Sequence, residues 1–307
     1  MLYKGSVFKY KKLRGEAVMD EWKNRLVHLD HCRSISWKAK FHILKNDPNL
    51  HNLYDHSTAY WKEILELPSS KTSLFLKDLA NKELQNMPSI YEKNHIQCIT
   101  FLDDSYPDQL SVIYQQPWIL YCKGNPHLLH NTKILAIIGS RTPTEYGKKM
   151  VNYLIPDLVK ADVCILSGLA KGIDSHAQLK AVKNGGNVIA VIGGGLFNIY
   201  PKENIALADL IMKNGLVLSE YPPIMKPEPW HFPMRNRIIS GLSRAILVVE
   251  GKQRSGTFIT IQHGLEQGKD IYAVPGSVFS ELSAGPHALI KEGAKLINHA
   301  NDILYEW

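Results

Sequence analysis

Short apolar runs divide the middle of the chain, between Lys133 and Val274, into regular units. Six runs have the length of a β-strand and are apolar nearly throughout, at residues 133–138, 163–166, 187–192, 216–218, 245–249 and 270–274. A segment long enough for a helix separates each run from the next. Continuous apolar strands indicate a sheet buried on both faces, and their alternation with helices indicates right-handed crossovers. The pattern predicts an α/β core with an extended Rossmann-like, doubly wound and mostly parallel sheet.

The region ahead of this core has a different pattern. Within residues 1–75 apolar side chains recur at roughly helical spacing, for example at Leu26 and Leu29 and again at Trp61 and Leu65. We predict a small helical domain here. A SAM-like module that contacts nucleic-acid backbone fits this pattern, and a packing domain without a ligand fits it at least as well.

Residues 76–130 are expected to connect the two parts. The segments 96–101 and 118–121 have the composition of strands, and each is followed by residues that favour turns. We expect both strands to extend the sheet at an edge. The second domain is therefore predicted to span residues 76–307, with its core at 131–307.

Composition adds only weak constraints on the class of protein and its partners. The 307 residues suffice for two folding units, and 45% hydrophobic and 21% charged residues are ordinary for a soluble globular protein. The net charge of +7 favours a polyanionic partner. The four cysteines are scattered without a C-x-x-C pair, so we expect buried free thiols and no metal site. Without a long apolar run or a signal peptide, the chain is expected to be cytoplasmic and not to span a membrane.

A ligand site can be located from the strand order, because open parallel sheets bind ligands beyond the carboxyl ends of their strands. Glycines let the backbone approach a ligand, helix N-termini offer free N–H groups, and basic side chains add full charges. These features predict a phosphate-binding rim. Its candidate residues follow the first, second, third and fifth core strands: Gly139, Ser140, Arg141, Gly168, Lys171, Gly172, Gly194, Arg254, Ser255, Gly256 and Thr257.

Two common nucleotide sites do not fit this rim. A dinucleotide site needs G-x-G-x-x-G after the first strand, where this chain has Gly139-Ser140-Arg141. A P-loop needs lysine after its second glycine, where this chain has Thr257 after Gly256. We therefore expect no nucleotide cofactor.

An aromatic and basic segment at residues 230–237 follows a proline-rich loop. Aromatic rings can stack on unpaired bases, and arginines can neutralise backbone phosphates. This combination predicts a single-stranded nucleic-acid site with contacts from Phe232, Arg235, Asn236 and Arg237. The alternative is that the aromatic rings belong to the core and the arginines are surface charges at the start of a helix.

Six motifs occur in order along the chain: Gly139-Ser140-Arg141, the segment 167–174, Gly193-Gly194-Gly195 with Tyr200-Pro201, the segment 219–222, Phe232-Pro233-x-Arg235-Asn236-Arg237 and Arg254-Ser255-Gly256-Thr257. Taken together, these motifs resemble the DprA/Smf family of DNA-processing proteins. The resemblance covers about residues 100–296, and residues 1–75 resemble the family's variable N-terminal domain only loosely.

The resemblance implies a non-enzymatic mediator of DNA recombination in natural transformation. Such a protein binds and protects incoming single-stranded DNA, displaces single-strand-binding protein and helps to load the RecA recombinase. It also implies a homodimer, with residues 282–296 as an expected interface. Some relatives carry a C-terminal winged-helix domain, which we do not expect in this chain.

The family's DNA pocket matches Gly139, Ser140, Arg141 and Phe232, with Arg235 and Arg237 nearby. One position departs from the family pattern. Relatives often have a basic residue two or three places before the phenylalanine, where this chain has Pro229 and Trp230. Either Lys226 replaces that charge or Trp230 adds a stacking surface.

The alternative function is a nucleotide-processing enzyme, because the same sheet architecture resembles LOG-type phosphoribohydrolases. Those enzymes place a catalytic glutamate after a glycine-rich motif, at or near the position of Thr260 in this chain. Asp174 and Glu220 are then the candidate acids, although Asp174 is also well placed to cap a helix.

Overall fold

The structure is a computed structural model that describes residues 16–253 and 255–307. The chain divides into two compact units, at residues 1–103 and 104–307. The boundary therefore lies after residue 103 rather than after residue 75. Residues 76–103 fall in the first unit because they contribute to its core: Tyr91 is fully buried, and its hydroxyl is hydrogen-bonded to the ring of His31.

The first unit is built from helices, as the apolar spacing predicted. Trp22, Leu26, Trp61 and Phe75 are buried at its centre. Serine side chains cap two of the helices, a common way to satisfy free N–H groups at a helix start. The elements are α2 (Glu16–His31), α3 (Trp37–Asn46), α4 (Thr58–Leu65), α5 (Ser69–Leu79), α6 (Lys82–Gln85), α7 (Met87–Lys93) and the strand β1 (Gln97–Thr100).

The second unit contains a mostly parallel sheet, and all six predicted core strands are confirmed. Within this unit the strand order is β2-β6-β5-β4-β3-β7-β8-β9. Only the first of these pairs, β2 with β6, is antiparallel. The strands are β2 (Ile119–Gly124), β3 (Ile134–Ile138), β4 (Cys164–Ser167), β5 (Val188–Val191), β6 (Leu216–Ser219), β7 (Ala245–Val248), β8 (Asp270–Ala273) and β9 (Lys295–Leu296).

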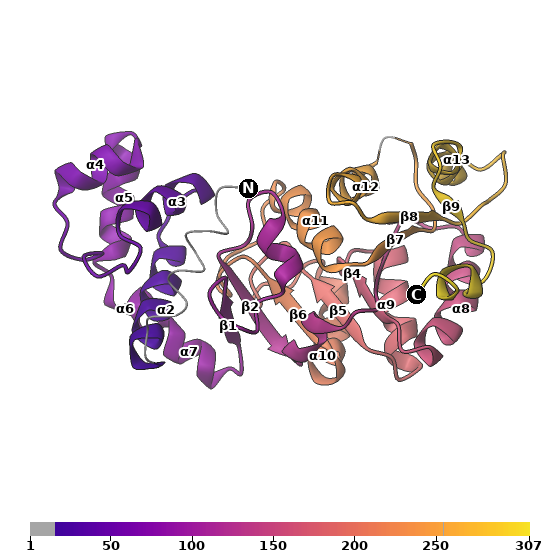
Figure 1. Cartoon of the computed structure of the whole chain (residues 1–307), viewed down its shortest axis with the longest axis horizontal. Helices are drawn as coiled ribbons and strands as arrows, with labels where there is room; N and C mark the ends of the chain where they lie inside the picture. The colour runs from indigo at the N-terminus through magenta and orange to yellow at the C-terminus, as the bar shows by residue number, and fades with distance from the viewer. Residues whose placement is uncertain (1–15, 254) are drawn as a thin grey trace. The chain divides into compact units, whose positions relative to one another are not determined.

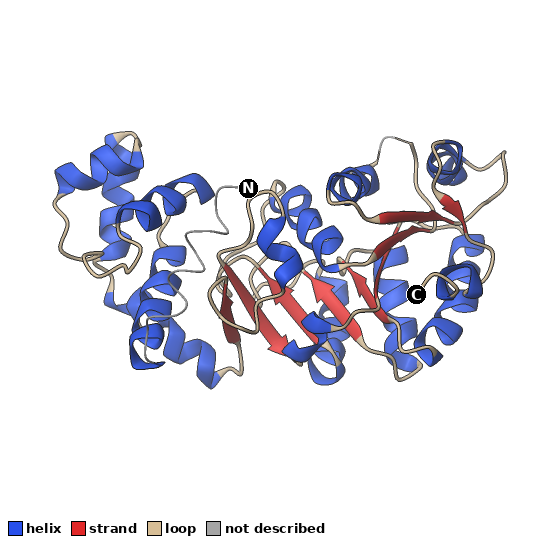
Figure 2. Cartoon of the chain, viewed as in Figure 1, coloured by secondary structure: helices blue, strands red, loops and turns tan. Residues whose placement is uncertain are grey.

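Helices cover both faces of this sheet, which explains why its central strands are apolar on both sides. Helices α9 and α10 lie against one face, and α11 and α12 against the other (Figure 1). The strands between these two layers are drawn in red in Figure 2. The helices are α8 (Glu145–Lys160), α9 (Ile173–Lys183), α10 (Ile205–Asn214), α11 (His231–Leu242), α12 (Gly256–Glu266), α13 (Ala284–Lys291) and α14 (Asn301–Leu304), with short 3-10 turns η1 (Asp108–Val112), η2 (Pro126–His130), η3 (Lys202–Asn204) and η4 (Glu281–Ser283).

The direction of winding reverses at β3. From this strand the chain moves through β4, β5 and β6 on one side, and then returns to place β7 on the other side. A crevice at the carboxyl ends of β3 and β7 is therefore the expected ligand position of this sheet. None of the helices in the described part of the chain is long and apolar enough to cross a membrane.

Candidate nucleic-acid interface

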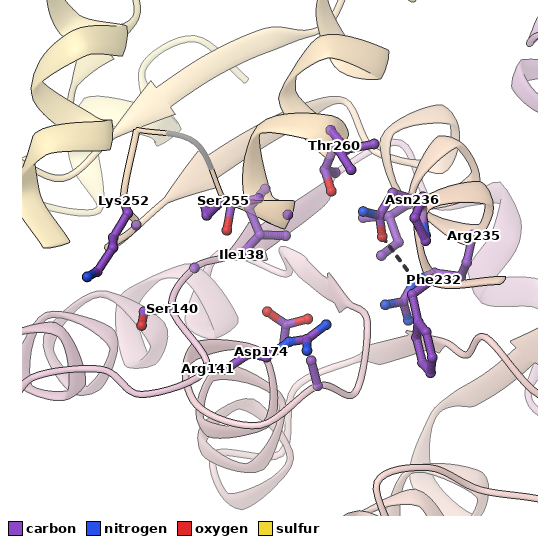
Figure 3. Close-up of a pocket in the computed structure, with 18 of the residues that line it drawn as sticks. Ile138, Ser140, Arg141, Asp174, Phe232, Arg235, Asn236, Lys252, Ser255 and Thr260 are labelled. Atoms are coloured by element: carbon purple, nitrogen blue, oxygen red, sulfur yellow. Dashed lines mark hydrogen bonds between the residues drawn. The ribbon is translucent and has the colours of Figure 1, made fainter. Parts of the chain in front are cut away.

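A cavity of about 480 Å³ lies at this reversal point. Three segments that are distant in sequence form most of its wall: the turn after β3, the first turns of α11, and the turn after β7 with the start of α12. Ala170, Asp174 and Leu282 complete the lining. Figure 3 shows Lys252 and Ser140 on one side of the cavity and Phe232, Arg235 and Asn236 on the other.

The structure brings most of the predicted site residues together. Those that line the cavity are Gly139, Ser140, Arg141, Phe232, Arg235, Asn236, Ser255, Gly256 and Thr257. Five others lie outside its lining: Gly168, Lys171, Gly172, Gly194 and Arg237. Arg254 lies outside the described residues.

Arg141 lies in the turn after β3 and is exposed. Within the described chain, its guanidinium has no ion pair with a carboxylate. The turn that carries it is packed closely against the residue before α9. Gly172 has a φ of +80°, and a Cβ at this position would lie 2.2 Å from the carbonyl oxygen of Ser140. Gly172 therefore shapes the arginine turn, and a larger residue would displace it.

Gly168 and Gly194 also allow close packing of neighbouring groups. A Cβ on Gly168 would lie 2.7 Å from the guanidinium of Arg235, and a Cβ on Gly194 would lie 3.1 Å from the side chain of Pro227. These two glycines were predicted as binding residues, and neither lines the cavity.

Arg235 forms part of the cavity floor. Its side chain is buried, and its Nη1 donates hydrogen bonds to the carbonyl oxygens of Gly168, at 2.6 Å, and Val191, at 2.5 Å. Burial lowers the pKa of Arg235 to about 10, and the charge of Asp174 opposes this shift. The carbonyls belong to the residue after β4 and to the last residue of β5, so Arg235 connects two strand ends and is not a free cation at the cavity mouth.

Asp174 is the only carboxylate among the described residues that line the cavity. It is buried and accepts a hydrogen bond from the backbone N–H of Gly168 at 3.1 Å. Burial raises the pKa of Asp174, and the charge of Arg235 works against that rise. The two residues therefore stabilise each other's charged forms beneath the cavity.

Arg237 does not reach the cavity, which corrects the prediction that it contacts a ligand there. Its side chain is buried and forms an ion pair with Glu220, with Nη2 and Oε2 2.6 Å apart. Two residues along an α-helix correspond to a rotation of about 200°, so Arg235 and Arg237 point to opposite sides of α11. Glu220, a candidate acid of the enzyme alternative, is likewise used in this pair.

Phe232 is half-buried, at the start of α11, and lines the cavity. Its ring lies 5.6 Å from that of Tyr200, with the ring planes inclined by 53°. A Cβ at Gly193 would come within 3.0 Å of the Phe232 ring, so this glycine allows the ring to pack closely against the turn after β5. Trp230 is 61% exposed and meets His231 only edge-on.

The predicted contact Lys171 and the cavity-lining Lys252 are each paired with an exposed carboxylate. Lys171 lies 2.7 Å from Glu203, and Lys252 lies 2.6 Å from Glu281. Exposed pairs of this kind contribute little to stability, because water and salt screen their charges. A phosphate can therefore displace either carboxylate at small cost.

Sequence reasoning missed two contributors. Glu250 is buried after β7, and its carboxylate accepts hydrogen bonds from the backbone N–H and the hydroxyl of Thr144, which fixes the end of the Arg141 turn. An acid directly after an apolar strand was the available signal. Leu282 closes one side of the cavity from the 3-10 turn η4, and its sequence neighbourhood gives no comparable signal.

Comparison with known proteins places the chain in a family. The family model described as DNA recombination-mediator protein A matches residues 97–307. The chain belongs to this family. Among its relatives, DNA processing protein DprA of Bacillus subtilis is 45% identical over 224 residues, which cover 73% of this chain and 75% of the relative. Family membership supports a DNA-processing, recombination-mediator role.

Solved structures agree with this assignment. The X-ray structure of DprA from Streptococcus pneumoniae matches with a TM-score of 0.79 and 38% identity, over 92% of this chain and 98% of that one. It confirms the Rossmann-like α/β fold and the helical N-terminal region. DprA from Helicobacter pylori, whose structure is described as revealing a single-stranded DNA binding mode, matches with a TM-score of 0.62 and 29% identity, over 69% of this chain and 96% of that one.

Proposed function

We propose that this chain binds single-stranded DNA in the cavity at the carboxyl ends of β3 and β7. The observation that carries the proposal is that Arg141 and Phe232, about ninety residues apart in sequence, line the same cavity. An exposed guanidinium can bind a phosphate, and a half-buried ring can stack on an unpaired base. The net charge of +7 and the single-stranded DNA binding described for the Helicobacter pylori relative support it.

The finer role follows from the family resemblance. The chain acts in the cytoplasm as a non-catalytic mediator of natural transformation. It protects incoming single strands and helps RecA to replace single-strand-binding protein on them. It works as a homodimer, with residues 282–296 in the interface.

Fluorescence anisotropy tests the DNA site. Labelled oligo(dT), oligo(dC) and oligo(dA), and a duplex of equal length, are titrated with the wild type, with Arg141→Ala and with Lys183→Ala. Lys183 is an exposed lysine at the last turn of α9, whereas the first turn of the same helix carries Asp174 of the cavity floor. We expect tighter binding to the single strand and a roughly tenfold loss for Arg141→Ala only, equal for oligo(dT), oligo(dC) and oligo(dA), because phosphate contacts carry no sequence information.

Equal losses for Arg141→Ala and Lys183→Ala would show that the cavity is not the binding site. The mediator role has a separate test, in which RecA strand exchange is measured on DNA coated with single-strand-binding protein. The wild type is expected to increase the rate, and Arg141→Ala to increase it less. Release of base from a nucleoside monophosphate by the purified protein, abolished by Glu220→Ala, would instead support the phosphoribohydrolase alternative.

A further inference from the structure

A second aromatic ring continues the surface of Phe232 beyond the cavity. Tyr200 lies in the connection between β5 and α10, and 53% of its surface is exposed. Its ring centroid is 5.6 Å from that of Phe232, yet Tyr200 is not part of the cavity lining. The pair therefore forms a stepped aromatic surface with one ring inside the cavity and one outside.

The segment that carries Tyr200 is fixed to the cavity wall. The side-chain amide of Asn204 donates hydrogen bonds to the carbonyl oxygens of Leu169, at 2.8 Å, and Ala170, at 3.3 Å. Asn204 is itself buried, and Ala170 lines the cavity. Tyr200 is therefore presented from an anchored turn, and a ligand that stacks on it pays little ordering entropy.

A cation lies on the same pair of segments. Lys171 follows Ala170 directly, and Glu203 precedes Asn204. The two charged groups are 2.7 Å apart and both about half exposed. An aromatic ring and a lysine thus lie on two turns that one buried asparagine connects. The ring can stack on a base and the lysine can bind a phosphate, so together they can bind one nucleotide.

The ring geometry also discriminates between strand forms. A strand of duplex DNA advances about 3.4 Å per nucleotide, with its bases parallel. The two rings here are 5.6 Å apart and inclined by 53°. Two successive bases can occupy both rings only when the strand is extended and its bases are splayed, which a paired duplex does not allow.

We propose that Tyr200 and Lys171 form a second nucleotide subsite, next to that of Phe232, over which a single strand leaves the cavity. Glu203 competes with the incoming phosphate for Lys171. This proposal rests on the function proposed above. It implies that the separation and inclination of the two rings favour single-stranded over duplex DNA.

Oligo(dT) binding by Tyr200→Leu, Tyr200→Phe and Tyr153→Leu tests the ring. Tyr153 is a matched control, because it is 56% exposed on α8 and does not line the cavity. Tyr200→Leu is expected to weaken binding about fivefold to tenfold, at the low end for loss of one base–aromatic stack. Tyr200→Phe and Tyr153→Leu are expected to bind as the wild type does.

Photo-crosslinking checks the same subsite without a substitution. Oligonucleotides that contain 5-iodouracil are irradiated with the wild-type protein, and the linked peptides are identified by mass spectrometry. A link at Tyr200 supports the subsite. Links that never include Tyr200, or a Tyr200→Leu variant with wild-type affinity, would overturn it.

The charge competition is tested with Glu203→Gln. Because this substitution frees Lys171, affinity is expected to rise about twofold to threefold and the log–log salt slope to steepen by up to about 0.7. Adding Lys171→Gln should cancel both changes. Unchanged affinity and slope in Glu203→Gln would refute the competition.

Two further variants separate this proposal from the proposed function. If Phe232→Ala and Arg141→Ala weaken binding while Tyr200→Leu does not, the cavity binds DNA and the second subsite is wrong. If neither Phe232→Ala nor Arg141→Ala changes binding, the cavity itself is not the DNA site.

Discussion

Replacing Arg235 with methionine is expected to destabilise the second unit by about 3–5 kcal/mol, the usual cost of removing one partner from a buried charge arrangement. The substitution leaves the buried carboxylate of Asp174 without the positive charge that faces it. It also removes the donor for the carbonyls of Gly168 and Val191. The methionine side chain is of similar length, so the loss of unfolding free energy reflects charge and hydrogen bonding more than packing.

The loss should depend on pH in a defined direction. Burial raises the pKa of Asp174 above its ordinary value of 3.8 in the wild type, and removing Arg235 raises it further. Above pH 3.8 the Asp174 carboxyl of the unfolded state has lost its proton, whereas the folded state still holds it until the pH passes the raised pKa. The variant therefore loses stability as the pH rises through the raised folded-state pKa. The deficit against the wild type is therefore larger at about pH 8 than at about pH 5.

Hydrogen-exchange mass spectrometry measures this loss, because peptides from β4 and β5 report on the second unit separately from the first. The double variant Arg235→Met/Asp174→Asn should recover a large part of the stability, since it removes the uncompensated charge. Lys183→Ala provides a surface control with no expected change. A loss below about 1 kcal/mol, or one that Asp174→Asn leaves unchanged, would refute the reasoning.

Three further outcomes are expected. Gly172→Ala should lower the melting temperature and weaken oligo(dT) binding together, because the φ of +80° and the 2.2 Å approach to Ser140 cost on the order of 1–3 kcal/mol; unchanged melting would contradict this. Phe232→Ala should weaken oligo(dT) binding by roughly 1–3 kcal/mol while leaving the salt dependence of binding unchanged. A loss of thermal stability with unchanged binding would show that the ring is a core residue and not a DNA contact. Burial lowers the pKa values of His28 and His31 below 6.5, so the unfolding free energy of the first unit should fall as pH drops below 6.5. Urea titrations at several pH values measure this free energy for the wild type and for His28→Gln/His31→Gln. The double variant should show a weaker dependence on pH.

The sheet could be predicted from the sequence because strands buried on both faces are apolar at nearly every position. The site could be located for a related reason. Parallel strands place their carboxyl ends together, so the turn that carries Arg141 and the start of α12 were expected at the same edge. The cavity at β3 and β7 contains both.

Side-chain direction could not be predicted in the same way. Arg235 and Arg237 belong to one motif, and only the phase of α11 against the sheet decides that one lines the cavity while the other pairs with Glu220. The boundary between the units was misplaced because Tyr91 packs with residues far away in sequence. Leu282 reaches the cavity through a long-range contact that no local pattern records.

The salt dependence of oligo(dT) binding tests the central claim, that Arg141 acts as a phosphate contact in a single-strand site. If about four phosphates are neutralised, log affinity should fall with log salt concentration with a slope near −3 for the wild type, and the slope should be about 0.7 shallower for Arg141→Ala. A slope that Arg141→Ala leaves unchanged, with affinity also unchanged, would contradict the claim.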